Sequence, residues 1–420
     1  MTPAIPVAAP RNADHVALMN SNRVKAGVFV LEGLNSLSVT LYLYYIFFFT
    51  QTRFGFTSRR NLVLAATVGF VYIFASVFGG RFGQRHGYFT ALRVGFPIMG
   101  GALLVGLWVE NVAAHLILLW VYTAGTCFTW PALEALVSER EPPLRLQRMI
   151  GVYNLVWAGT GAIAYFSGGA LIERFGSKVI FAVPLAVHVF EWALAHWLES
   201  QARSSALSSG SPRSGPVVLA EIPLNPRPIQ RVKTFLRMAW LANPLAYIAI
   251  NTVIPTIPAL ARRLELSPRL AGYFCSVWLF ARAIAFLVLW LWPGWHYRFR
   301  WMGGAYLAML ACFVLMLTGS DLRVLAGAQL LFGAAVGLLY YSSLYYSMDV
   351  GERKGEHGGI HEAAIGVGNF IGPAVGAAAL HVFPEQRNSA TWAVSGLLAA
   401  GLPVLLWLRF RRGNRRTCRG

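Results

Sequence analysis

Hydrophobic residues occur along the chain in long blocks of about twenty positions, separated by short polar segments. A block of this length crosses about 30 Å of hydrocarbon as an α-helix, because each helical residue rises about 1.5 Å. The blocks are rich in Leu, Ala, Val, Gly and Phe, and they lack the alternating pattern of membrane β-strands. Twelve transmembrane helices are therefore predicted, at 27–50, 61–80, 90–109, 112–137, 149–172, 178–198, 235–261, 270–292, 301–319, 322–347, 359–382 and 390–408.

The composition agrees with this pattern. Charged residues make up only 13% of the chain, and hydrophobic residues make up 56%. Soluble proteins contain about 25% charged residues, which keep their surface in water. The chain has too little charge for such a surface, so the sequence predicts an all-α membrane protein.

Basic residues are concentrated on one side of the predicted membrane. With a cytoplasmic N-terminus, the cytoplasmic segments hold 25 of the 36 Lys and Arg residues, the outer loops hold 10, and Arg282 lies inside a span. Lys and Arg favour cytoplasmic loops, so both termini are predicted to be cytoplasmic. The orientation of the chain in the membrane thus explains the net charge of +19. The charge therefore gives no reason to expect a nucleic-acid partner.

The two ends of the chain differ in character. Residues 1–26 are polar and lack the apolar core of a signal peptide, so the first span is expected to direct membrane insertion. Residues 409–420 form a basic tail, which is expected to contact anionic lipid head groups. Its arginines are Arg409, Arg411, Arg412, Arg415, Arg416 and Arg419.

Motifs for ATP-driven transport, metal binding or catalysis are absent from the sequence. It contains neither a phosphate-binding Gly-x-x-x-x-Gly-Lys-Ser/Thr loop nor a His-Glu-x-x-His motif. Cys127, Cys275, Cys312 and Cys418 lack the spacing of metal ligands or of a disulfide framework. We therefore expect no cofactor, no metal and no enzyme activity.

The predicted spans form two groups of six. They flank a Ser-, Pro- and Arg-rich segment at 199–233, which is expected to be a flexible cytoplasmic linker. The predicted units are the tail at 1–26, a bundle at 27–198, this linker, a second bundle at 234–408 and the basic tail. The groups repeat at an offset of 208 residues, as secondary transporters often do around a central site. The matching pairs are Asn35 with Asn243, Gly125 with Gly333, Gly151 with Gly359, and Gly168 with Gly376.

Three motifs indicate a family. The loop after the second span reads GRFGQRHG at 80–87, a second copy lies at 169–178, and span 11 contains a glycine-proline pattern at 366–376. These motifs resemble those of the major facilitator superfamily, and the resemblance covers nearly the whole chain. Gln84 stands where that family has an acidic residue.

This resemblance implies a fold and a mode of action. It implies two pseudo-symmetric six-helix bundles that act as a monomer and move a small-molecule solute by alternating access. It places spans 1, 4, 7 and 10 around a central cavity. It also implies an inner gate that contains Gly80, Gln84, Arg85 and Gly87.

Glu32 is an acidic residue inside the first span, where a charge is costly. Asn35 and Tyr42 follow at i+3 and i+10, so the three side chains form a polar stripe on one face of the helix. The stripe predicts a protonatable group that faces the central cavity. The alternative is a carboxylate that only supports helix packing near the interface.

Arg282 and the pair His361–Glu362 are the other ionisable candidates. Arg282 lies in the middle of span 8 and stays charged, so it is predicted to bind an anionic group or to pair with Glu32 or Glu362. A structural ion pair is the alternative. A carboxylate beside a histidine suits proton transfer, although neighbours on a helix point about 100° apart and only one is expected to face the cavity. The alternative for this pair is a gate at the inner surface.

Aromatic and amide side chains of the central spans are candidates for substrate binding. A lining of this kind suits a sugar, an aromatic acid or another amphipathic organic molecule. Packing in the core or at the membrane interface is the alternative for each residue. The candidates are Tyr42, Trp130, Asn251, Tyr341 and Tyr345.

The leading hypothesis is a proton-coupled transporter of a small organic solute. From the sequence alone, a facilitative uniporter and a non-transporting sensor or assembly protein of the same fold stay open. Short loops and the absence of Asn-x-Ser/Thr sites favour a bacterial inner membrane.

Overall fold

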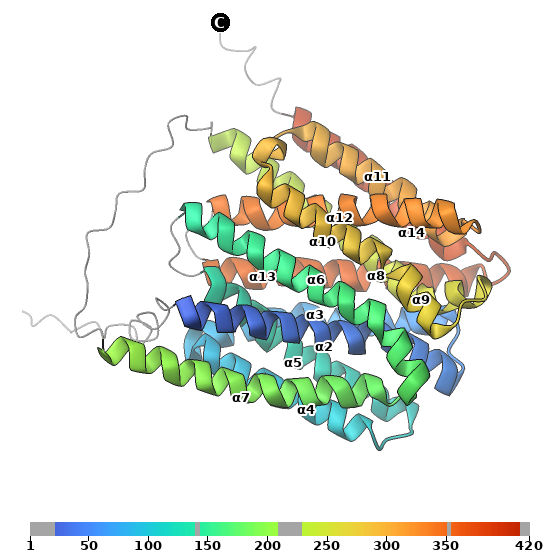
Figure 1. Ribbon diagram of the computed structural model, residues 1–420. Helices are drawn as coiled ribbons and strands as arrows, with labels where there is room; N and C mark the ends of the chain where they lie inside the picture. Colours follow the sequence, from blue (N-terminus) through green and yellow to red (C-terminus); the bar gives the residue numbers. More distant parts are fainter. Residues whose placement is uncertain (1–21, 139–142, 209–228, 351–353, 412–420) are drawn as a thin grey trace, which may run out of the picture.

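The computed structural model describes residues 22–138, 143–208, 229–350 and 354–411. These residues form α-helices and one short 3-10 helix, η2 (Pro293–Trp295), with no strand among them. The helices, labelled as in Figure 1, are α2 (Asn22–Phe54), α3 (Ser58–His86), α4 (Tyr88–Gly106), α5 (Val112–Ser138), α6 (Pro143–Phe175), α7 (Val179–Ser208), α8 (Ile229–Arg263), α9 (Pro268–Cys275), α10 (Val277–Leu291), α11 (Phe299–Thr318), α12 (Leu322–Val350), α13 (Lys354–Val382) and α14 (Ser389–Phe410).

The prediction of twelve spans is confirmed. Twelve segments of the described chain are long and apolar enough to cross a membrane, and α9 and α10 together supply one of them. Between these two helices, the hydroxyl of Ser276 donates to the carbonyl of Tyr273 at 2.9 Å. Such a bond competes with the regular backbone pattern and accompanies the interruption.

The predicted linker at 199–233 is partly helical. Helix α7 continues to Ser208, and α8 begins at Ile229. The Arg203 guanidinium contacts the Glu199 carboxylate at 2.5 Å, a pairing at i and i+4 that favours a helix. Residues 209–228 lie outside the described part of the chain.

The helices run side by side (Figure 1). Twelve crossings place Asn22 and Arg411 at the same end of the bundle, which we call the tail end, and we call the opposite end the far end. Helices α2, α4, α5 and α7 pack mainly within the first half, and α8, α10, α11, α12 and α14 pack mainly within the second, whereas α3, α6, α9 and α13 make most of their contacts across the junction. The two halves meet along two seams, one between α3 and α13 and one between α6 and the α9–α10 pair.

Glycine allows close backbone approach at both seams. A Cβ atom at Gly69 would lie 2.4 Å from the backbone of Asn369, and one at Gly366 would lie 3.0 Å from the backbone of Ile73. A Cβ atom at Gly169 would lie 2.0 Å from the carbonyl oxygen of Pro268. Small residues at such contacts let membrane helices pack tightly without side-chain interference.

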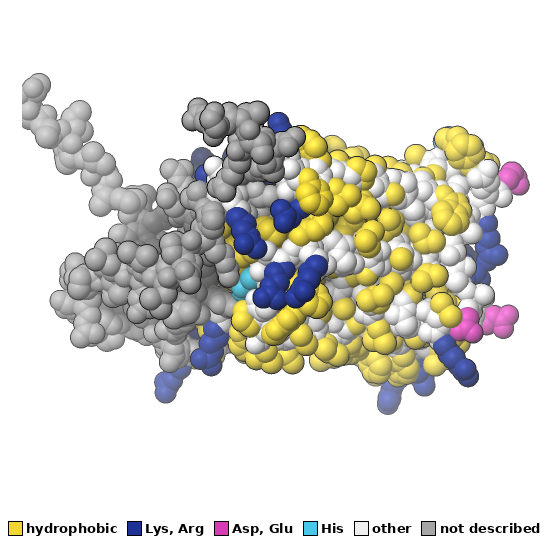
Figure 2. Space-filling view, turned by 90° about the horizontal axis from the view of Figure 1, so that it is seen from above, with side chains coloured by type: hydrophobic (Ala, Val, Ile, Leu, Met, Phe, Trp, Pro, Cys, Tyr) yellow, Lys and Arg dark blue, Asp and Glu magenta, His cyan; other side chains and the backbone are white. Residues whose placement is uncertain are grey.

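The surface matches a membrane environment. Figure 2 shows hydrophobic side chains over the middle of one face, with charged side chains gathered toward the two ends. Large apolar side chains such as Phe74 and Phe78 are exposed on the bundle. Of the basic tail, the structure describes only Arg409 and Arg411, so the contact of the other arginines with lipid stays a prediction.

Candidate functional site

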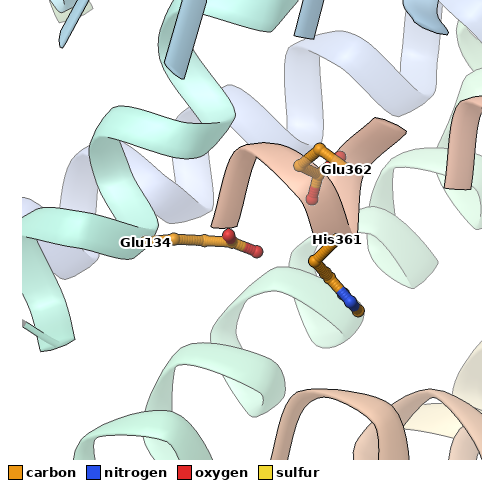
Figure 3. A group of neighbouring side chains, drawn as sticks. All are labelled: Glu134, His361 and Glu362. Carbon is orange, nitrogen blue, oxygen red and sulfur yellow. The ribbon is translucent and has the colours of Figure 1, made fainter. Parts of the chain in front are cut away.

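Three carboxylates from distant parts of the chain are buried at the junction of the two halves. Glu32 comes from α2, Glu134 from α5 and Glu362 from α13, and their exposed fractions are 0%, 6% and 5%. Figure 3 shows the Glu134 side chain extending from α5 toward the segment that carries His361 and Glu362. Ligating atoms of these last three residues all lie within 4.8 Å of one another.

Glu362 lies well inside the bundle. It is two turns beyond the start of α13 at Lys354, and its carboxylate accepts a hydrogen bond from the hydroxyl of Tyr72. Tyr72 is in the middle of α3, so this bond joins the two halves at mid-depth. His361 is also buried, and its Nδ1 lies 3.4 Å from the hydroxyl of Ser343.

Glu32 and Glu134 are poorly compensated. None of their four carboxylate oxygens has a hydrogen bond of ordinary geometry within the described chain. Tyr153 of α6 is near enough to interact electrostatically with both side chains. Three unpaired negative charges in one buried cluster would repel strongly and lose their hydration. The cluster therefore requires bound protons or a bound cation in this closed arrangement.

The same cluster has the atoms of a cation site. Two carboxylates and an imidazole at this spacing can ligate a metal ion. The sequence did not predict this set, because Glu134 is more than 220 positions from its two partners along the chain.

Arg282 lies beside aromatic rings from both halves. Its exposed fraction is 5%, and its guanidinium carbon lies 4.4 Å from the ring centre of Trp157 and 5.2 Å from that of Trp278. It also reaches Tyr44 on α2. The structure shows no ion pair between Arg282 and any carboxylate of the described residues, so the predicted pairing with Glu32 or Glu362 does not occur here. Cation–π contacts hold the guanidinium in its place.

Trp157 and Tyr340 connect Arg282 with the carboxylates. Their rings stack with centres 5.1 Å apart, and the Tyr340 ring lies 5.5 Å from the imidazole of His361. Phe286 packs against both rings, with its ring centre 5.9 Å from that of Trp157 and 5.7 Å from that of Tyr340. We use the name central site for Glu32, Glu134, Trp157, Arg282, Tyr340, His361 and Glu362.

Two further predicted residues lie near this site. Asn35 accepts a hydrogen bond from the hydroxyl of Thr129 at 3.4 Å, one turn along α2 from Glu32. Trp130 packs edge-on against Trp157, with ring centres 6.4 Å apart. Trp130 therefore packs on a member of the central site, whereas the contact of Asn35 is to Thr129.

Other predicted binding residues lie elsewhere. Tyr42 packs against Tyr122 within the first half, and Asn251 donates to the side-chain oxygen of Asn369 at 2.6 Å. Tyr341 and Tyr345 both pack on Trp295, near the tail end. The structure does not bring these four candidates together with the carboxylates.

The predicted gate motif forms a very short connection. Gly87 alone separates α3 from α4, with a φ of 96°, and its N–H donates to the carbonyl of Gly83 at 2.9 Å. Residues with a Cβ atom rarely adopt this positive φ, which explains why a glycine occupies the position. Gly80 is buried, Gln84 is half-buried and Arg85 is exposed. Their role in gating stays a prediction.

Polar contacts join the two halves at the far end. The Arg269 guanidinium pairs with the Glu173 carboxylate at 3.0 Å, and Arg59 lies 3.2 Å from the Nδ1 of His381. Asn61 also donates to the carbonyl of Pro255 at 3.5 Å. These contacts close the far end above the central site.

Twelve spans, two helical groups and buried polar residues at their junction define a secondary transporter fold. Such proteins move a solute by exposing a central site alternately to the two sides of the membrane.

The chain belongs to the Major Facilitator Superfamily, whose sequence model matches residues 28–356. Two solved structures share the fold, each with a TM-score of 0.64. The human organic anion transporter MFSD10 (TETRAN) is 15% identical, and the match covers 91% of this chain and 99% of that one. A bacterial homolog of the human lysosomal transporter Spinster, inward-facing and unoccupied, is 12% identical over 92% of this chain and 95% of that one. No curated protein matches the chain by sequence.

Proposed function

We propose that the protein is a proton-coupled transporter of a small organic anion. The observation that carries the proposal is the central site, where buried carboxylates without ordinary partners lie near a buried arginine that pairs with none of them. The carboxylates are suited to bind protons, and Arg282 is suited to bind the solute. The solved MFSD10 structure is that of an organic anion transporter, which agrees with this solute class.

Charge balance links the two cargoes. A solute anion and a proton together add no net charge to the central site. An anion that binds without a proton adds one negative charge to a buried region that already holds three carboxylates, where charges are costly. Binding of the anion therefore favours binding of a proton at the carboxylates, and closure with both cargoes bound couples their transport.

The aromatic rings indicate the shape of the solute. Trp157, Trp278 and Tyr44 surround the Arg282 guanidinium, and Tyr340 continues the surface toward His361. Flat apolar groups stack on such rings, while a carboxylate or sulfonate pairs with the guanidinium. An aromatic or amphipathic organic acid fits both features.

The membrane setting is part of the same proposal. The Lys and Arg distribution supports a cytoplasmic tail end. The proposal further holds that the chain acts as a monomer in a bacterial inner membrane. The far end, which is closed here, then faces outward.

Uptake into proteoliposomes tests the function. Pooled aromatic and amphipathic organic acids are offered with and without an imposed pH gradient, and with a neutral sugar pool as control. Gradient-driven accumulation of an acid supports the proposal. Uptake that is the same with and without the pH gradient indicates a facilitator. Uptake that a chelator abolishes indicates coupling to a divalent cation. A protein that binds acids but moves none is a sensor rather than a transporter.

A further inference from the structure

A large apolar groove lies on the membrane-facing side of the α3–α13 seam. Its volume is about 990 Å³, and α3, α5 and α13 form its walls. Val63 and Phe70 are about half exposed along it, so the groove opens sideways toward lipid. No residue of the central site lines it.

Three basic side chains lie at the far end of the groove. Arg59 and Arg60 are in the first turn of α3, and His381 is in the last turn of α13. No acidic residue lines the groove, and neither arginine pairs with a carboxylate within the described chain. Two arginine cations at the level of the head groups and an apolar channel below them match the two parts of an anionic phospholipid.

The groove also has a suitable length. From Arg59 to Phe70 the helix rises about 16 Å, which takes the groove to the middle of a hydrocarbon layer about 30 Å thick. An acyl chain from the leaflet at the far end covers the same depth. The polar Thr67 within the groove accepts a hydrogen bond from the indole of Trp120 at 3.0 Å, so it offers little to a polar solute.

We propose that this groove binds one anionic phospholipid of the leaflet at the far end, with an acyl chain between α3 and α13 and its phosphate at Arg59, Arg60 and His381. Arg59 belongs to the first half and His381 to the second, and the two side chains are in contact. A phosphate that contacts both holds the halves together. The lipid therefore stabilises the arrangement in which the far end is closed, because opening this end separates the two parts of its site.

Lipid retention in native mass spectrometry tests the proposal. The full-length protein is purified with an equimolar mixture of phosphatidylglycerol and phosphatidylcholine that have identical acyl chains. The wild type is expected to retain one phosphatidylglycerol in preference to phosphatidylcholine. The double variant Arg59→Gln/Arg60→Gln is expected to reduce this preference about tenfold, because each cation near an anionic head group favours its binding.

Two further variants separate the parts of the groove. Ala378→Trp fills an exposed position in the apolar wall and is expected to lower retention of both lipids. Arg262→Gln/Arg323→Gln removes two exposed far-end arginines outside the groove and is expected to change nothing. Equal retention of both lipids by the wild type would overturn the proposal. So would an unchanged preference in the Arg59/Arg60 variant, or a bound non-lipid solute that Ala378→Trp displaces.

Discussion

Two sets of buried glutamates lie in the membrane-spanning part of this protein, and they differ in their surroundings. Glu191 of α7 is fully buried, and its carboxylate lies 2.6 Å from Nδ1 of His188. The other ring nitrogen of His188 lies 3.1 Å from the hydroxyl of Tyr122. All three residues belong to the first half of the chain. Glu191 thus has a hydrogen-bond partner for one carboxylate oxygen, Oε2, within its own half, and this pairing does not depend on how the two halves are arranged.

Glu32 and Glu134 are buried to a similar degree but lack such partners. They face Glu362 across the junction, so their surroundings change whenever the halves move apart. Burial alone therefore does not identify a functional carboxylate in a membrane protein. An incomplete set of partners at a moving interface is the more informative feature.

The largest expected effect comes from replacing a glutamate by glutamine in the central site and comparing it with the same replacement at Glu191. Glu134→Gln removes a proton-binding group, so gradient-driven uptake of the organic acid is expected to fall to the level of empty liposomes. Wild-type uptake is expected to rise as the loading side becomes more acidic, because closure requires bound protons. Any uptake that remains in Glu134→Gln is expected to be independent of pH. The measurement is uptake against external pH at fixed membrane potential.

Glu191→Gln is the matched control for this experiment. It changes an equally buried glutamate outside the central site, and it is expected to retain pH-dependent uptake. If both variants lost coupling equally, or if Glu134→Gln kept a normal pH profile, the distinction between the two sets would be wrong.

Substitutions of Arg282 test whether the central site also binds the solute. Arg282→Gln is expected to raise the apparent KM for the acid about tenfold to a hundredfold, since a hydrogen bond to a charged group contributes about 1.5–3 kcal/mol. Arg282→Lys keeps the charge but loses the planar guanidinium, so a partial effect is expected. Initial uptake rates over a range of solute concentrations give both values. An unchanged KM in Arg282→Gln would show that the solute binds elsewhere.

The sequence predicted much of the fold and part of this site. Helix length and charge predicted the spans, and the cost of ionisable groups in hydrocarbon singled out Glu32, Arg282 and Glu362. It did not predict their meeting with Glu134, which depends on how two halves pack. Tyr341 and Tyr345 do share a helix face, but that face packs on Trp295.

Tyr340 shows how small the missing information was. It precedes Tyr341 by one residue and therefore points about 100° away on the same helix. This rotation turns its ring to Trp157 and His361. The residues around Trp157 in the sequence form no polar pattern, so the sequence alone does not distinguish it from a residue that only packs in the core. Helical periodicity groups residues by face, but only the tertiary structure shows which face borders the site.

A smaller effect is expected when the Tyr122–His188–Glu191 network loses its central member. His188→Leu leaves the Glu191 carboxylate without its partner, which is expected to reduce stability by about 1–3 kcal/mol. Glu134→Gln is expected to keep or raise stability, because it removes one ionisable group from a buried cluster of carboxylates that repel one another. Thermal unfolding in detergent compares the two variants. His196→Leu is the control, since this half-buried histidine lies on the same helix without a carboxylate partner.

The smallest effect is expected at the ion pair that closes the far end. Arg269 and Glu173 belong to different halves, as the central carboxylates do, but 51% of the Arg269 side chain and 24% of the Glu173 side chain are exposed. Exposed pairs contribute about 0.2–1 kcal/mol, so Glu173→Gln is expected to shift the balance between far-open and far-closed states less than about fivefold. Labelling of a cysteine introduced at Ser267 beside this pair measures that shift, with Glu265→Gln as a nearby exposed control. If Glu173→Gln shifted the balance between far-open and far-closed states as much as Glu134→Gln does, the exposed ion pair, rather than protonation of the buried carboxylates, would control closure.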